Sequence, residues 1–183
     1  MKTITLPDEM NLEKSQHVHV VDYSSTKDVS KQQIILNQNI ISFLIEGTKE
    51  VIFDTTELSI TPSKFLIMRS GNCLMTEKKI SVTSGYKSIL LFFSNEMIHN
   101  FIRKMESEKS ESIEVKSVYA FDYDDFLKRF VESLVDISKL PSAVQQKMLE
   151  VKFEELMLYL TAKYGTEFLH SLTINTDDTA QKF

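Results

Sequence analysis

Short apolar runs separated by turn-forming residues fill the first half of the chain. Apolar and polar positions alternate within most of these runs, which is typical of β-strands. Most separators are only two or three residues long, and connections of that length join neighbouring antiparallel strands. Many short strands without intervening helices predict a barrel or a sandwich. The clearest predicted strands are residues 32–36, 40–46, 50–54, 58–61, 65–69, 73–76 and 88–94.

The hydrophobic period changes near residue 95, and the pattern after it is helical. Asp122 can cap the second of three predicted helices, while Pro141 and Gly165 bound the third. We therefore expect a β-barrel over residues 1–94 and a helical section over residues 95–170, followed by a polar linker over residues 171–183. The stretch 106–116 is rich in serine and charge and is expected to be an exposed loop. The predicted helices are residues 95–105, 122–137 and 142–164.

The last predicted helix carries two apolar stripes on nearly opposite sides. A helix at the edge of a domain needs only one such stripe. In one interpretation the preceding helix and the barrel cover both stripes; in the other, the second stripe meets the same helix of another copy. The first stripe contains Leu149, Phe153, Leu156, Met157, Leu160 and Tyr164. The second, our predicted homodimer interface, contains Val144, Met148, Val151, Glu155, Leu158 and Ala162.

Composition excludes several classes of protein. Of the 183 residues, 42% are hydrophobic and 26% are charged, which excludes wholesale disorder. The net charge of −5 argues against this chain binding a DNA phosphate backbone by itself. Only four glycines occur, far apart, and they cannot form a glycine-rich phosphate loop. The N-terminus has no apolar signal segment and no run of apolar residues could span a membrane, so we expect a cytoplasmic protein.

Candidate catalytic chemistry is sparse. His17 and His19 have the spacing of two metal ligands on one strand face, but no third ligand follows, and we interpret them as exposed residues of an edge strand. Glu96 and His99 form one copy of a di-iron element that requires two. Cys73, the single cysteine, is expected to be a small buried apolar residue. We therefore predict no catalytic residues, no metal site and no cofactor.

One ordered set of motifs is shared with a known family. Residues 41–47 (ISFLIEG), 50–54 (EVIFD) and 58–68 (LSITPSKFLIM) resemble the cupin-type N-terminal domain of AraC-family transcription regulators, in particular the ExsA-like subgroup. The resemblance spans roughly residues 30–165. The turn at residues 62–64 lacks the Gly and the acid of the family pattern. Residues 37–39 are Asn-Gln-Asn, where metal-using cupins carry a His-x-His pair.

The resemblance implies a regulatory module that is mainly β with C-terminal α, a cupin-like antiparallel β-barrel followed by a helical pair used for dimerisation. The barrel would sense a small molecule or a partner protein such as an antiactivator, and DNA would be bound only by a helix-turn-helix domain that follows the linker. A metal-dependent cupin enzyme is the alternative. If the barrel holds a ligand rather than a packed core, we expect its lining on the apolar strand faces, with Arg69 facing an anion. These residues are Ile41, Phe43, Ile45, Val51, Phe53, Phe65, Ile67 and Arg69.

Overall fold

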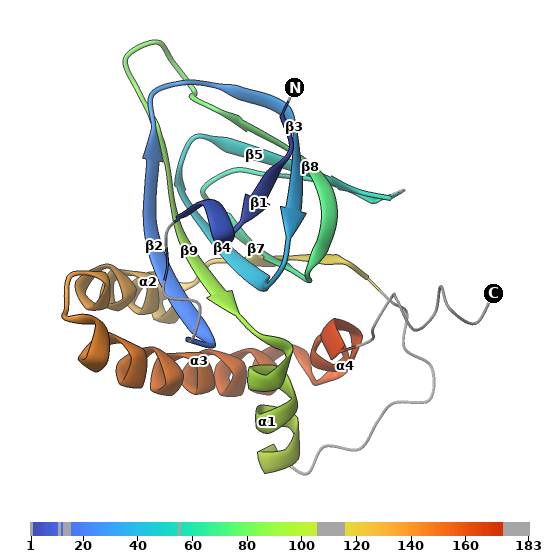
Figure 1. Cartoon of the computed structure of the whole chain (residues 1–183), viewed down its shortest axis with the longest axis vertical. Coiled ribbons are helices and arrows are strands. Elements are labelled where there is room, and N and C mark those ends of the chain that lie inside the picture. Colours follow the sequence, from blue (N-terminus) through green and yellow to red (C-terminus); the bar gives the residue numbers. More distant parts are fainter. Residues whose placement is uncertain (1, 11, 13–15, 55, 106–115, 174–183) are drawn as a thin grey trace.

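Two five-stranded sheets face each other to form a barrel, and a layer of helices covers the outer face of one of them (Figure 1). The computed structural model describes residues 2–10, 12, 16–54, 56–105 and 116–173. All strand pairs are antiparallel except β1 with β3. The first sheet has the order β1 (Ile4–Leu6), β3 (Val29–Leu36), β8 (Gly71–Lys78), β5 (Thr48–Phe53), β6 (Thr56–Ile60). The second has the order β10 (Val118–Asp122), β7 (Lys64–Met68), β4 (Asn39–Glu46), β9 (Tyr86–Phe93), β2 (Val18–Ser25).

The helices follow the second half of the sequence, except for a short 3-10 helix near the N-terminus. In the helical layer, α3 lies beneath the barrel, with α1 and α4 near one of its ends (Figure 1). The α1 and α3 bounds agree with the predicted helices. The helical elements are η1 (Asp8–Met10), α1 (Asn95–Met105), α2 (Asp125–Ser138), α3 (Ser142–Tyr164) and α4 (Glu167–Thr173).

The hydrophobic core has two parts, one on each side of the second sheet. The part inside the barrel includes Ile40, Leu44 and Val51. The part between the second sheet and the helices includes Ile41 and Phe43. Neighbouring residues of β4 thus point into different parts of the core, because successive side chains of a strand face opposite ways. The strands β4, β7 and β9 are apolar on both faces for this reason.

The structure bears out the seven predicted strands and adds elements that the sequence pattern did not reveal. The added elements are β1, β10 and α4, and β2 extends well beyond the edge strand expected at His17 and His19. Asp122 is the last residue of β10 rather than a helix cap, so the barrel is not confined to residues 1–94. The helix α4 runs to Thr173, into the predicted linker, and residues 174–183 lie outside the described part. Most of the predicted loop at 106–116 also lies outside it.

Asp124 joins the start of α2 to the end of α3. Its carboxylate accepts hydrogen bonds from the Leu127 backbone N–H at 2.8 Å, from the Lys163 Nζ at 2.8 Å and from the Tyr159 hydroxyl. Burial alone raises the pKa of the Asp124 carboxyl, but the hydrogen bonds from Lys163, Tyr159 and Leu127 outweigh it and lower the pKa to about 2. The ionised carboxylate is therefore the form that stabilises the fold.

We expect an Asp124→Asn variant to be less stable than the original chain by about 1 kcal/mol near neutral pH, because the amide can cap α2 but cannot carry the charge. The carboxyl of an unfolded chain has a pKa of about 3.9. Because the folded-state pKa is lower, the stabilisation is present above that value and is lost as the pH falls through it toward about 2. Urea unfolding at several pH values checks this expectation. A stability difference that stays constant between neutral pH and about pH 2.5 would contradict it.

Candidate functional site

A cavity of about 500 Å³ extends from the protein surface into the barrel. Its walls come from both sheets and from η1, and most of the side chains that line it are apolar. Small-molecule sites in proteins have this character, with volumes of roughly 300–1,000 Å³ and a few placed polar groups. The main apolar residues of the wall are Ile4, Leu6, Val21, Ile34, Met75 and Leu90.

A largely buried ion pair contributes to the polar part of the cavity wall, together with Glu9, Tyr23 and Gln32. Lys49 on β5 and Glu77 on β8 are directly opposite each other across the two strands. The Lys49 Nζ lies 3.0 Å from the Glu77 Oε2 and 3.2 Å from the Ser42 Oγ on β4. Lys49 is only 2% exposed. The contact of Lys49 with Ser42 therefore links the two sheets inside the barrel, and both charged residues line the cavity.

The surroundings of Lys49 keep it charged. Burial lowers the pKa of its ammonium, but the oxygens of Tyr86 and Glu77 outweigh that effect and raise it. Burial raises the pKa of the nearby Tyr86 hydroxyl to about 12. It likewise raises the pKa of the Cys73 thiol to about 12, so Cys73 is a buried, protonated thiol, as expected for a structural cysteine.

Sequence reasoning missed Lys49 and Glu77 although a signal was present. The strand β5 alternates between half-buried and buried residues, and Lys49 shares the buried face with Val51 and Phe53. A lysine in phase with two buried apolar residues points into the core and requires a partner. The partner comes from β8, and its identity depends on the β5–β8 register, which the sequence pattern did not specify.

The structure does not bring the eight predicted pocket residues together. Val51 and Phe53 lie inside the barrel, whereas Ile45 is 45% exposed. Four others belong to the core between the second sheet and the helices, on the opposite side of that sheet from the cavity. The prediction chose the wrong face of β4 and β7 because both faces of these strands are apolar. The four misplaced residues are Ile41, Phe43, Phe65 and Ile67, and none of the eight lines the cavity described above.

Arg69 follows β7 and also lies outside the barrel cavity. Its backbone N–H donates to the Ser117 carbonyl at 2.9 Å, and its side chain is buried. Burial lowers the pKa of the guanidinium, with Tyr119 opposing the shift. Among the described residues no carboxylate forms an ion pair with Arg69, and its Nη1 has no hydrogen-bond partner there.

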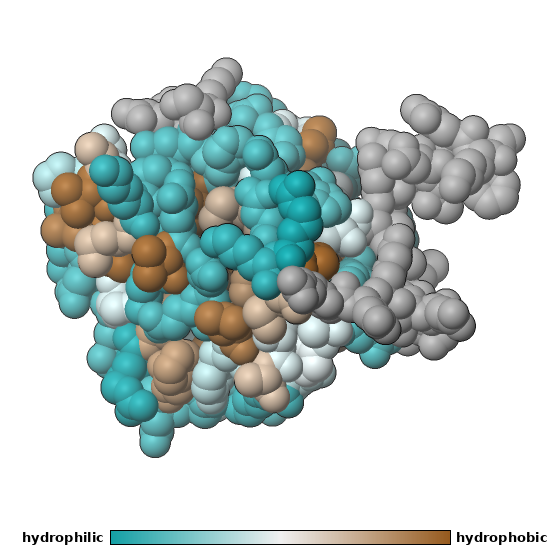
Figure 2. Space-filling model, turned by 90° about the horizontal axis from the view of Figure 1, so that it is seen from below, coloured by the Kyte–Doolittle hydropathy of each residue, from teal (hydrophilic) through white to brown (hydrophobic). Residues whose placement is uncertain are grey.

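The second apolar stripe of α3 lies on the surface of the protein. The first stripe, apart from Tyr164, is buried against the sheet, whereas Val151 in the second is 66% exposed. Neither α2 nor the barrel covers the second stripe, so the first interpretation of the two stripes is wrong. Figure 2 shows apolar patches among polar residues on the underside of the molecule, where the helical layer lies. The exposed residues of the stripe are Val144, Met148, Val151, Leu158 and Ala162, with Glu155 half-buried and bound to Lys152.

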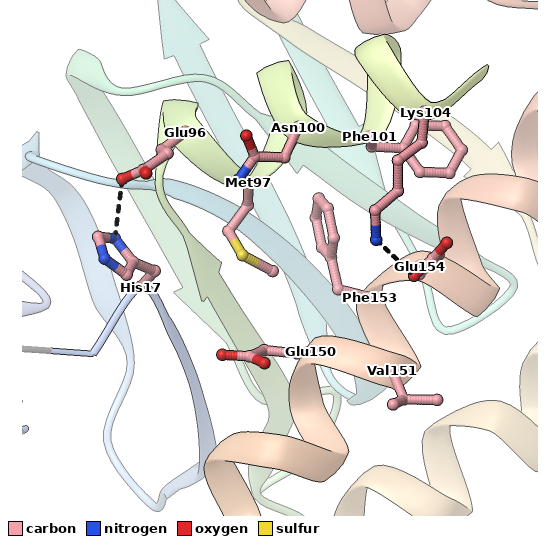
Figure 3. A pocket seen from close by; sticks show the side chains of 10 residues that line it. All are labelled: His17, Glu96, Met97, Asn100, Phe101, Lys104, Glu150, Val151, Phe153 and Glu154. Carbon is pink, nitrogen blue, oxygen red and sulfur yellow. Dashed lines mark hydrogen bonds and ion pairs between the residues drawn. The ribbon is translucent and has the colours of Figure 1, made fainter. Parts of the chain in front are cut away.

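A second hollow, of about 360 Å³, lies between α1 and α3 (Figure 3). Its apolar side chains are Met97, Phe101 and Phe153, and Val151 joins it to the exposed stripe. Ion pairs lie on its rim (Figure 3). They join His17 Nδ1 to Glu96 Oε2 at 3.6 Å and Lys104 Nζ to Glu154 Oε2 at 3.4 Å.

The predicted histidine arrangement is half right. The strand β2 is at the edge of its sheet and His17 is exposed, but His19 is 5% exposed. The first residues of β2 are covered on both faces, and His19 points away from Val18 and Val20, which pack on the helical side. Within the described ranges, no group of three or more His, Cys, Asp or Glu side chains is placed to hold a metal ion. No helix within those ranges is long and apolar enough to cross a membrane.

Several solved structures have a similar fold. An apo variant of ToxT from Vibrio cholerae strain SCE256 superposes with a TM-score of 0.60 at 13% identity, over 83% of this chain and 58% of that chain. ToxT from V. cholerae O395 bound to (E)-4-(8-methylnaphthalen-1-yl)but-3-enoic acid gives a TM-score of 0.54 at 12% identity, over 84% and 60%. Wild-type ToxT of strain SCE256 bound to an unsaturated fatty acid gives 0.52 at 14% identity, over 81% and 55%. This chain therefore spans somewhat over half the length of these proteins.

These likenesses, at low sequence identity, concern the fold, and they confirm the predicted β-barrel with C-terminal helices. No curated protein sequence matches the chain. The family model described as the ExsA N-terminal regulatory domain matches residues 39–171, which confirms the resemblance noted from residues 41–68. Because this match spans most of the sequence, the chain belongs to the family of ExsA N-terminal regulatory domains.

Proposed function

We propose that this chain is the sensing and dimerisation part of an AraC-type transcription regulator and that its barrel cavity holds a small-molecule effector. The observation that carries the proposal is the mainly apolar cavity of about 500 Å³ with the Lys49–Glu77 pair in its wall. A barrel that serves only as a scaffold can be filled by its own side chains. Because the net charge of this chain is −5 and DNA carries negative phosphates, we expect another segment of the regulator to contact DNA.

The solved relatives support a small effector. Two of the ToxT structures hold a small organic molecule, in one case an unsaturated fatty acid and in the other a substituted butenoic acid. Control by a partner protein, such as an antiactivator, is the second form of the proposal, and the exposed hollow between α1 and α3 favours it. A cytoplasmic location is part of the proposal, because a regulator must reach DNA.

Dimerisation through α3 is the other part of the proposal. The apolar stripe from Val144 to Ala162 is exposed along the helix, and exposed apolar faces of this kind mark interaction surfaces. A stripe that runs along one helix suits an isologous contact, in which the same helix of a second copy packs against it.

The alternative of a metal-dependent cupin enzyme receives no support from the described residues. Metal-using sites need several His or carboxylate ligands on one centre, and no such group is found there. The family description also names a regulatory domain. Metal analysis of the purified protein tests this part directly, since stoichiometric iron, manganese, nickel or zinc would favour the enzyme.

Filling the cavity tests the proposed sensing function. Ile34 points into the cavity and its neighbour Ile35 is 39% exposed on the other face of β3. We expect native mass spectrometry of the full-length regulator from its own host to detect a bound small molecule in the original protein and in Ile35→Phe but not in Ile34→Phe. DNA binding should stop responding to that molecule in Ile34→Phe alone. If all three proteins carry no small molecule and regulate normally, the partner-protein form of the proposal is favoured.

A further inference from the structure

We infer that the barrel cavity selects an uncharged amphiphile, an apolar molecule with one hydroxyl or primary amide group, over a carboxylate of the same size. This inference rests on the proposed function, in which the cavity holds the effector. It follows from three properties of the cavity wall: its apolar extent, the hydrogen-bonding capacity left at the ion pair, and the sign of its charge.

The apolar part of the cavity wall determines that most of the ligand is apolar. Ile4 and Leu6 of β1 face the cavity, as do Ile34 of β3, Met75 of β8 and Leu90 of β9. Both sheets thus contribute, so a bound molecule is surrounded by apolar side chains over much of its surface. Burying apolar surface there is favourable by roughly 25 cal/mol per Å², which suits a hydrocarbon body.

The Lys49–Glu77 ion pair determines which polar head group the ligand can carry. The Lys49 ammonium has three N–H donors, and contacts with Glu77 at 3.0 Å and Ser42 at 3.2 Å use two of them. The Glu77 carboxylate can accept up to about four hydrogen bonds, of which Lys49 and the nearby Tyr86 hydroxyl supply at most two. A further polar group next to the pair can therefore accept from Lys49 and donate to Glu77 at once. A hydroxyl or a primary amide does both, whereas a carboxylate only accepts.

The charge of the wall excludes a carboxylate. The charged residues that line the cavity are Lys49, Glu77 and Glu9, which leaves an excess of one negative charge. Lys49 is already neutralised by Glu77, and both are largely removed from water. A ligand carboxylate would lie beside Glu77 as a like charge in a poorly solvated space, or would displace Glu77 and leave it buried without its partner. Either arrangement is costly, whereas an uncharged head group meets neither penalty.

Three probes with the same alkyl chain test the inference: decanol, decanoate and decylamine, at pH 7. Binding is followed by calorimetry and by the ¹³C-methyl resonance of Met75, which lines the cavity. We expect decanol to shift the Met75 resonance and to bind at least about tenfold more tightly than decanoate. Decanoate or decylamine binding as tightly as decanol would overturn the inference while leaving the cavity a ligand site. If no probe shifts Met75, the small-molecule form of the proposed function fails, and the inference with it.

Two variants separate charge from packing. Glu9 is exposed at the cavity rim and does not belong to the ion pair. A Glu9→Gln change should strengthen decanoate binding severalfold and leave the affinity for decanol unchanged. The matched control is Glu57→Gln, an exposed position on β6 away from the cavity.

The double variant Lys49→Met with Glu77→Leu removes the polar group without leaving a buried charge, and decanol binding should fall about tenfold. Unchanged decanol binding in the double variant would overturn the assigned head-group contact.

Discussion

A Glu77→Leu variant is expected to lose about 3–5 kcal/mol of unfolding free energy, because the change leaves the Lys49 ammonium buried without its ionic partner. Lys49 is 2% exposed, and its other hydrogen bond among the described residues is to the Ser42 Oγ, at 3.2 Å. A single hydroxyl does not replace the solvation that a charge loses on burial. Urea unfolding at pH 7, followed by circular dichroism, measures the loss.

Two controls make this expectation specific to the ion pair. The double variant Lys49→Met with Glu77→Leu should recover most of the lost stability, because an apolar pair of similar volume needs no ionic partner. Glu154→Leu breaks an exposed pair with Lys104 at 3.4 Å and should change stability by no more than about 1 kcal/mol. If Glu77→Leu costs no more than Glu154→Leu, the buried pair does not contribute as described.

Val151→Glu and Leu158→Glu are each expected to convert a dimer to a monomer. Both side chains are exposed on the second stripe of α3, at 66% and 43%. A charge at the centre of a dry interface costs on the order of 2 kcal/mol or more, which weakens association by about 30-fold. Light scattering after size exclusion, at tens of micromolar protein, measures the change.

The matched control is Val82→Glu, at a position 92% exposed between β8 and β9, which should remain dimeric. Circular dichroism should show all three variants folded, because none of the side chains is buried within one chain. Only monomer in the original protein would refute the proposed interface. If Val151→Glu and Leu158→Glu unfold the domain, the stripe belongs to the core instead.

The sequence was most informative where one face of an element meets water. The helix α3 begins and ends where Pro141 and Gly165 predicted. Its second stripe is exposed, as expected in the interpretation in which no other element of the same chain covers it. The elements that escaped prediction are short or depend on distant partners. The strand β1 has three residues and pairs with β3, while β10 joins the second sheet by pairing with β7 after α1 has intervened.

The candidate site was much harder to predict than the fold. Ile41 and Phe43 were chosen as cavity residues because they are apolar and alternate, yet they face the helices. Their neighbours Ile40 and Leu44 face the barrel interior. Since both faces of β4 are covered, no polar residue marks the outer face, and a period of two fits either assignment.

The sequence by itself determined the strands from β3 to β9, the helices α1 and α3, the acidic balance of the chain and the second apolar stripe of α3, because all of these depend on local pattern and composition. Only the tertiary structure decided which face of the second sheet lines the barrel. It alone decided that Lys49 meets Glu77, since that contact depends on the register between β5 and β8. Lys49 and Glu77 are 28 positions apart in the sequence. The local pattern of apolar and polar residues does not predict which strands pair or in which register, so it could not predict this contact.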